Sequence, residues 1–72
     1  MSKDLKCGIL GGGSIGIRHT KNLINLGYDV TVFDVAAARL DIAKQLGANV
    51  TKNRAKLLDK SDALFICTPS GQ

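Results

Sequence analysis

The chain has 72 residues, of which 44% are hydrophobic, 22% charged and 4% aromatic, and its formal net charge is +4. This length allows one small domain at most, and the hydrophobic content excludes a disordered chain. The basic residues are scattered and aromatic residues for base stacking are almost absent, which argues against nucleic-acid binding.

The sequence also lacks the marks of an exported or membrane-spanning protein. The opening residues, MSKDLK, lead into a short apolar run without a signal-peptide cleavage site, and no apolar stretch has the length of a membrane span. The two cysteines, Cys7 and Cys67, do not have the pattern of a disulfide framework or a metal site. These observations predict a cytoplasmic protein.

The first half of the chain has the periodicity of a strand, a helix and a second strand. A short apolar run at 6–10 predicts a strand that ends at a cluster of glycines. Residues 14–26 have helical spacing, and Gly27 follows as a stop signal. The predicted apolar face of this helix consists of Ile15, His19, Leu23 and Leu26. Residues 28–34 are rich in β-branched and aromatic residues and predict the second strand.

The second half continues the alternation. The predicted elements are a helix at 36–46, a strand at 48–51, a helix at 53–60 and a strand at 63–69. Gly47 closes the first of these helices, and Asn53 is suited to cap the second. A β-α-β-α-β-α-β order with short connections predicts an α/β fold, with a parallel sheet, right-handed crossovers and helices on both faces. We expect four strands in the order 3-2-1-4.

The glycines lie where the first strand meets the first helix. Gly11, Gly13 and Gly16 match the pattern G-x-G-x-x-G. In this pattern the first glycine permits a tight turn, the second lets a pyrophosphate approach the backbone, and the third permits close packing of helix on strand. The N–H groups of Ser14, Ile15 and Gly16 stand at the positive end of the helix dipole. They predict an anion site.

An acidic residue strengthens this prediction. Asp34 follows Gly16 by 18 residues and ends the second strand, where a carboxylate accepts hydrogen bonds from adenosine ribose hydroxyls. Strand, loop, helix and acid together predict a dinucleotide site. The alternative is a glycine-rich turn that binds nothing, with Asp34 only capping the second helix. FAD and S-adenosylmethionine use related loops and stay open on the pattern alone.

The residues after the acid favour NAD over NADP. A carboxylate repels a 2′-phosphate, and NADP sites usually place an arginine nearby to offset that repulsion. Here Val35 and three alanines follow Asp34. Arg39 stands five residues on, within range of the adenosine, but an exposed helix arginine is its commoner explanation.

The strings GILGGGSIGIRHTKNL, VTVFD and FICTPSG together resemble the N-terminal part of the Gfo/Idh/MocA family of nicotinamide-dependent oxidoreductases. The resemblance spans residues 7–71, and its most specific elements are SIGIRH and the Thr68-Pro69 pair. It implies a Rossmann fold and hydride transfer between NAD(P) and a sugar, cyclitol or sugar nucleotide. The cofactor contacts that it implies are Gly11, Gly12, Gly13, Ser14, Ile15, Gly16, Asp34, Thr68 and Pro69.

The same resemblance implies that this chain does not act alone. The catalytic lysine and the substrate domain of that family have no counterpart in the sequence. We therefore expect residues 1–72 to be the N-terminal half of a dinucleotide-binding domain, with no catalytic and no metal-binding residue, and to be inactive by themselves. His19 is expected to pack on its helix face, and Cys67 to be a small buried residue.

Two other functions stay open. The first is a non-enzymatic NAD-binding or redox-sensing module. The second is a fragment that binds no ligand and forms a homo-oligomer through the exposed edge of its fourth strand, because open sheet edges recruit other chains.

Overall fold

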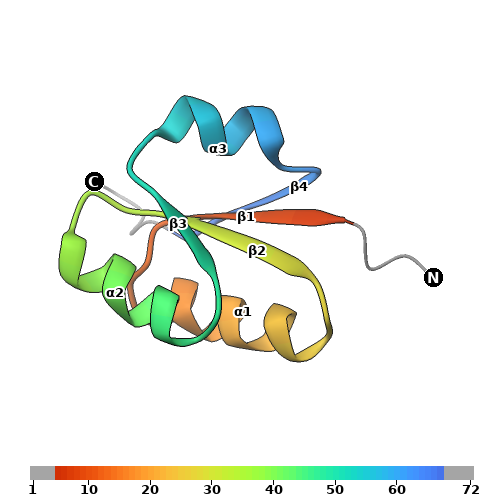
Figure 1. The fold of residues 1–72 in the computed structure, drawn as a ribbon, viewed down its shortest axis with the longest axis horizontal. Helices are drawn as coiled ribbons and strands as arrows, with labels where there is room; N and C mark the ends of the chain where they lie inside the picture. Colours follow the sequence, from red (N-terminus) through yellow and green to blue (C-terminus); the bar gives the residue numbers. More distant parts are fainter. Residues whose placement is uncertain (1–4, 68–72) are drawn as a thin grey trace.

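Four parallel strands form the centre of the structure, a computed structural model that describes residues 5–67 (Figure 1). The strands are β1 (Lys6–Leu10), β2 (Asp29–Phe33), β3 (Asn49–Thr51) and β4 (Ala63–Ile66), and they lie in the order β3-β2-β1-β4. Helices α1 (Ser14–Asn25) and α2 (Ala37–Gln45) cover one face of the sheet, and α3 (Arg54–Lys60) covers the other (Figure 1). The predicted partial Rossmann fold, strand order and layering are confirmed.

The strands end at the same edge of the sheet. Leu10 of β1 is in register with Phe33 of β2 and with Ile66 of β4, and Phe33 is in register with Thr51 of β3. The four segments that follow the strands therefore begin side by side. In open parallel sheets this carboxyl edge is where ligands bind.

The core lies between the sheet and helices α1 and α2. Alternate residues of β1 and β2 point to this face, as the pleat of a strand requires. The buried cluster consists of Cys7, Ile9, Val30, Val32, Leu40, Ala43 and Ala48. On the other face, the buried anchor of α3 is Leu57, which is 2% exposed.

The buried face of α1 differs from the predicted one. Ile15 and Leu26 are 59% and 56% exposed, whereas Gly16 and Thr20 are buried. The helix approaches the sheet so closely that small residues are needed at the contact. Thr20 satisfies its hydroxyl there by donating a hydrogen bond to the Gly16 carbonyl at 2.7 Å. The apolar spacing therefore predicted the helix but placed its inward side about one residue off.

Most element boundaries lie within one or two residues of the predictions. Helix α1 ends before Gly27 and α2 ends before Gly47, as predicted from the stop signals. Asn53 caps α3, because its Oδ1 accepts a hydrogen bond from the Lys56 N–H at 3.0 Å. The predicted end of the last strand at Pro69 lies outside the described residues. Within residues 5–67, the helices are too short and too polar to cross a membrane.

Candidate functional site

The glycine loop between β1 and α1 is fastened to the end of β2. Gly11 has a φ of 109°, a conformation that side chains disfavour, and its N–H donates to the Phe33 carbonyl at 2.9 Å. The next N–H, that of Gly12, donates to Oδ2 of Asp34 at 2.7 Å. Two successive backbone bonds thus place the loop against the acid that the sequence singled out.

The next two glycines of the motif have different surroundings. A Cβ atom at Gly16 would overlap the carbonyl oxygen of Gly11, so this position needs a residue without a side chain. A Cβ atom at Gly13 would meet no atom within 4 Å among the described residues. Gly16 thus serves helix packing, whereas Gly13 leaves open space in front of the backbone.

Gly13 is also the N-cap of α1. The first hydrogen bond of the helix runs from the Ile17 N–H to the Gly13 carbonyl at 2.8 Å. The N–H groups of Ser14 and Ile15 precede it, and helix geometry leaves such groups without a partner inside the helix. Together with the helix dipole they suit a negatively charged group.

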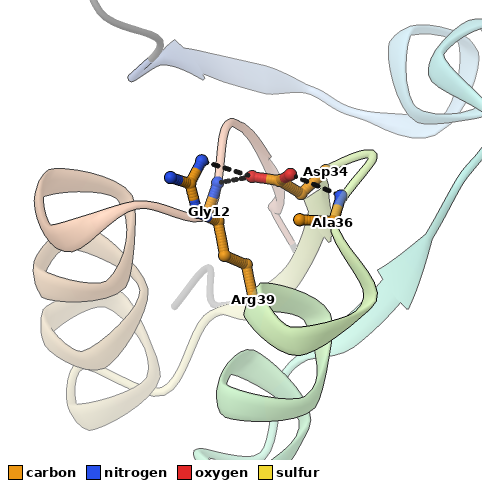
Figure 2. A network of polar contacts seen from close by, with 4 residues as sticks. All are labelled: Gly12, Asp34, Ala36 and Arg39. Carbon is orange, nitrogen blue, oxygen red and sulfur yellow. Dashed lines mark hydrogen bonds and ion pairs between the residues drawn. The ribbon is translucent and has the colours of Figure 1, made fainter.

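Asp34 is the centre of a polar network at the end of β2 (Figure 2). The residue is 5% exposed. Besides the bond from Gly12, Oδ1 accepts a hydrogen bond from the Ala36 N–H at 2.8 Å. A guanidinium nitrogen of Arg39 lies 3.6 Å from Oδ2.

These contacts keep the carboxyl ionised although it is buried. Burial by itself raises the pKa of the Asp34 carboxyl. The hydrogen bonds from Ala36 and Gly12, together with the Arg39 charge, outweigh burial and hold the pKa below its usual value. An ionised carboxylate has about four acceptor sites, so Asp34 keeps capacity for a hydroxyl donor besides its protein partners.

Arg39 has a more specific place than the sequence suggested. The expectation of an exposed helix arginine is only partly right. The Arg39 side chain is 54% exposed, but it also forms an ion pair with Asp34 (Figure 2). The arginine therefore reduces the negative charge that a bound adenosine ribose would meet. Its position five residues after the acid, in the first turn of α2, makes this contact possible.

A cleft of about 860 Å³ opens at this edge of the sheet. Of the predicted site residues, those that line it are Gly11, Gly13, Ser14, Ile15 and Asp34. Gly12 and Gly16 are buried behind it and support the loop. Thr68 and Pro69 lie outside the described residues. The cleft also includes Arg54, which the sequence reasoning missed; its place directly after the third strand was the available signal.

Cys67 and His19, the other two residues with reactive side chains that the sequence drew attention to, have surroundings that do not favour catalysis. Cys67 is half-buried and lines the cleft, so the expectation of a fully buried residue is only partly met. Burial still raises the pKa of its thiol, so the reactive thiolate is scarce at neutral pH. The His19 ring stacks on Phe65 of β4, with ring centroids 5.9 Å apart. His19 thus packs against the sheet, as expected, although its predicted neighbours Ile15 and Leu26 are exposed. Cys7 and Cys67 are free thiols.

A parallel sheet with a glycine loop at its carboxyl edge and a buried acid after β2 defines a dinucleotide-binding domain of the Rossmann type. Comparison with protein families gives the more specific assignment. The model of the NAD binding domain of 6-phosphogluconate dehydrogenase matches residues 6–72, so the chain belongs to this family. It is an NAD(P)-binding domain.

Individual relatives agree with this assignment. The chain is 36% identical over 64 residues to the cytokine-like nuclear factor N-PAC of Pongo abelii. The aligned residues cover 89% of this chain and 12% of that protein. It is 31% identical over 70 residues to 2-(hydroxymethyl)glutarate dehydrogenase of Eubacterium barkeri, with 97% and 23% covered. The solved imine reductase of a Pseudomonas species superposes with a TM-score of 0.83 at 26% identity, over 90% of this chain and 23% of that one. The chain thus spans less than a quarter of each of these proteins.

The predicted membership of the Gfo/Idh/MocA family is therefore wrong, although the predicted type of domain is right. The family match over residues 6–72 overturns it. A glycine loop followed by an acid after the second strand occurs in many dinucleotide-binding domains, so these features do not distinguish one such family from another. The sugar, cyclitol and sugar-nucleotide substrates that the resemblance implied lose their support with it.

Proposed function

We propose that the chain binds the adenosine diphosphate part of NAD within an oxidoreductase that transfers hydride to or from the nicotinamide. The observation that supports this most strongly is the Asp34 carboxylate, which lines the cleft, accepts a hydrogen bond from the glycine loop and is held ionised by its partners. The N–H groups of Ser14 and Ile15 would bind the pyrophosphate in front of Gly13. Asp34 would accept hydrogen bonds from the ribose hydroxyls.

The remaining predicted contacts join this proposal. Gly11, Gly12 and Gly16 shape the loop, and Thr68 and Pro69 stay proposed cofactor contacts that lie outside the described residues. We also propose that residues 1–72 are the N-terminal half of a dinucleotide-binding domain in a longer protein, which the small share of its relatives' length supports. The free thiols of Cys7 and Cys67 support the proposed cytoplasmic location.

The reaction itself would need residues beyond those of the cleft described here. When bound, the cofactor supplies the hydride acceptor or donor at its nicotinamide. Within residues 5–67, the ionisable side chains that line the cleft are Asp34, Arg39, Arg54 and Cys67. Asp34 is ionised and hydrogen-bonded, and the Cys67 thiol has a raised pKa, so neither is suited to exchange a proton with a substrate at neutral pH.

We propose NAD as the preferred cofactor over NADP. The Asp34 carboxylate would repel a 2′-phosphate, and the Arg39 charge would reduce this repulsion without removing the buried anion. A titration of the ¹⁵N-labelled chain with NAD, and then with NADP, tests this proposal. We expect NAD to shift the amide signals of Gly13, Ser14 and Ile15 at lower concentration than NADP. Equal or tighter NADP binding would reject the preference, and folded protein without shifts for either cofactor would reject the function.

A second candidate is an NAD-binding module without catalysis. The observation that favours it is the 36% identity to a protein described as a nuclear factor. The identity to a dehydrogenase favours the enzyme. Oxidation of NADH with a carbonyl or imine substrate by the longer protein that is proposed to contain this chain would decide for the enzyme.

For the chain of residues 1–72 by itself, as the alternative to a half-domain whose further strands would pair with β4, we propose that two copies associate through β4. In the part of the chain that the structure describes, β4 pairs on one side with β1, and its Leu64 and Ile66 are 39% and 70% exposed. Antiparallel pairing of two such edges would form one continuous sheet with twofold symmetry. Light scattering after size-exclusion chromatography should give the mass of a dimer, and Ile66→Lys should give a monomer. A monomeric mass for the unmodified protein at all concentrations contradicts the proposal.

A further inference from the structure

We propose that Arg54 stacks its guanidinium on the adenine ring of the bound dinucleotide. This inference rests on the proposed function and adds a contact to it. Arg54 is the first residue of α3 and is exposed, and it lines the same cleft as Gly13 and Asp34. The glycine loop follows β1 and Asp34 follows β2, whereas Arg54 follows β3. The site therefore draws on the ends of three strands.

Helix stability does not explain an arginine at this position. The start of a helix carries a partial positive charge, so a cation there is unfavourable. No acidic residue occupies the first turn of α3, and the Arg54 side chain forms no ion pair or hydrogen bond with any residue in 5–67. The other arginine of the cleft, Arg39, is instead paired with Asp34. Arg54 is thus the arginine whose guanidinium is available to a ligand.

The order of the strands indicates which part of the cofactor it meets. The pyrophosphate belongs at the loop after β1, and the adenosine ribose at Asp34 after β2. The next strand in the sheet is β3, and Arg54 follows it within three residues. A dinucleotide that continues in this direction brings its adenine to the part of the cleft where Arg54 stands.

The side chains there suit a flat aromatic ring. Val35 lines the cleft directly after Asp34 and is 82% exposed, an apolar group that the protein leaves in water. A purine bound between these two side chains would cover the isopropyl group of Val35 with one face and stack on the Arg54 guanidinium with the other. Arginine is suited to such stacking because its charged group is planar and weakly hydrated, whereas the lysine ammonium is a compact and strongly hydrated charge.

Three variants test the contact by calorimetric titration with NAD and with NADP. Arg54→Ala should weaken the binding of both cofactors by about 2- to 30-fold, the range expected for a cation on an aromatic ring. Arg54→Lys keeps the charge but loses the plane, and should weaken binding in the same range. Lys52→Ala is the matched control, because Lys52 is an exposed cation two residues before Arg54 that does not line the cleft. It should leave the affinity unchanged.

A spectroscopic signature separates stacking from attraction by charge. In the NAD complex of the unmodified protein, the ring current of adenine should shift the δ protons of Arg54 upfield. The absence of that shift in the complex, or full affinity in Arg54→Lys, would overturn the inference while NAD binding itself remained intact. If the unmodified protein failed to bind NAD, the proposed function would fail instead.

Discussion

Replacement of Gly16 by alanine should destabilise the protein by about 1–3 kcal/mol or more, the usual cost of forcing an extra carbon into a close-packed contact. The added methyl group would overlap the Gly11 carbonyl oxygen and come within 3.4 Å of Cγ2 of Ile9. Both neighbours belong to the rigid end of β1 and its loop, so neither moves cheaply. Helix α1 would have to shift away from the sheet, and the glycine loop with it. Urea unfolding followed by circular dichroism measures the effect.

Gly13→Ala is the matched control for this experiment. Its methyl group would enter open space, and its backbone angles, φ −73° and ψ −167°, are accessible to alanine. The weaker N-cap of alanine and the lower entropy of the unfolded chain offset each other within about 1 kcal/mol. Stability should therefore be close to that of the unmodified protein. NAD binding should be weaker, however, because the methyl group stands where the pyrophosphate approaches. A Gly16→Ala protein of normal stability, or a Gly13→Ala protein of normal affinity, would contradict these two roles.

The fold was predictable because its signals are local. The strands are short runs of β-branched and apolar residues, and Gly27 and Gly47 mark the ends of α1 and α2. Alternation of strands and helices then implies the parallel sheet. The inward face of α1 was not predictable from apolar spacing, because the closest contacts are made by Gly16 and Thr20, which are not hydrophobic. A helix face that packs through small residues shows no periodic pattern of hydrophobic residues in the sequence.

The site was predictable where a motif fixes backbone geometry. The glycine loop and Asp34 come together as expected, through the bond from Gly12 to the carboxylate. That bond could not be read from the sequence, and neither could the pairing of Arg39 with Asp34, since both depend on how the ends of β1 and β2 meet. Arg54 was missed because it belongs to no motif, although the predicted strand order places the end of the third strand beside that of the second.

Replacement of Asp34 should separate the stability of the loop from its affinity for the cofactor. Asp34→Ala leaves the buried N–H of Gly12 without its acceptor, which costs about 1–3 kcal/mol. Asp34→Asn keeps the size of the side chain but removes the charge that faces Arg39, and its single carbonyl oxygen can accept the hydrogen bond from Gly12 or from Ala36 but not both. We expect a smaller loss of stability in this variant and a clear loss of NAD affinity, because a neutral amide is a weaker acceptor for the ribose hydroxyls. Asp41→Asn, which neutralises an exposed carboxylate on α2, is the control and should change neither.

The stability difference between the unmodified protein and Asp34→Asn should also depend on pH. The folded protein holds the pKa of Asp34 below its usual value, so the folded state binds this proton less readily than the unfolded chain does. The contribution of the ionised carboxylate is therefore complete above the pKa of the unfolded chain, about 3.9, and declines as the pH falls below that value through the lower pKa of the folded state. Urea unfolding at pH 7 and in steps below pH 4 should show the two proteins converging in free energy of unfolding. A constant difference over this range would mean that the hydrogen bonds from Gly12 and Ala36 do not depend on the charge of Asp34.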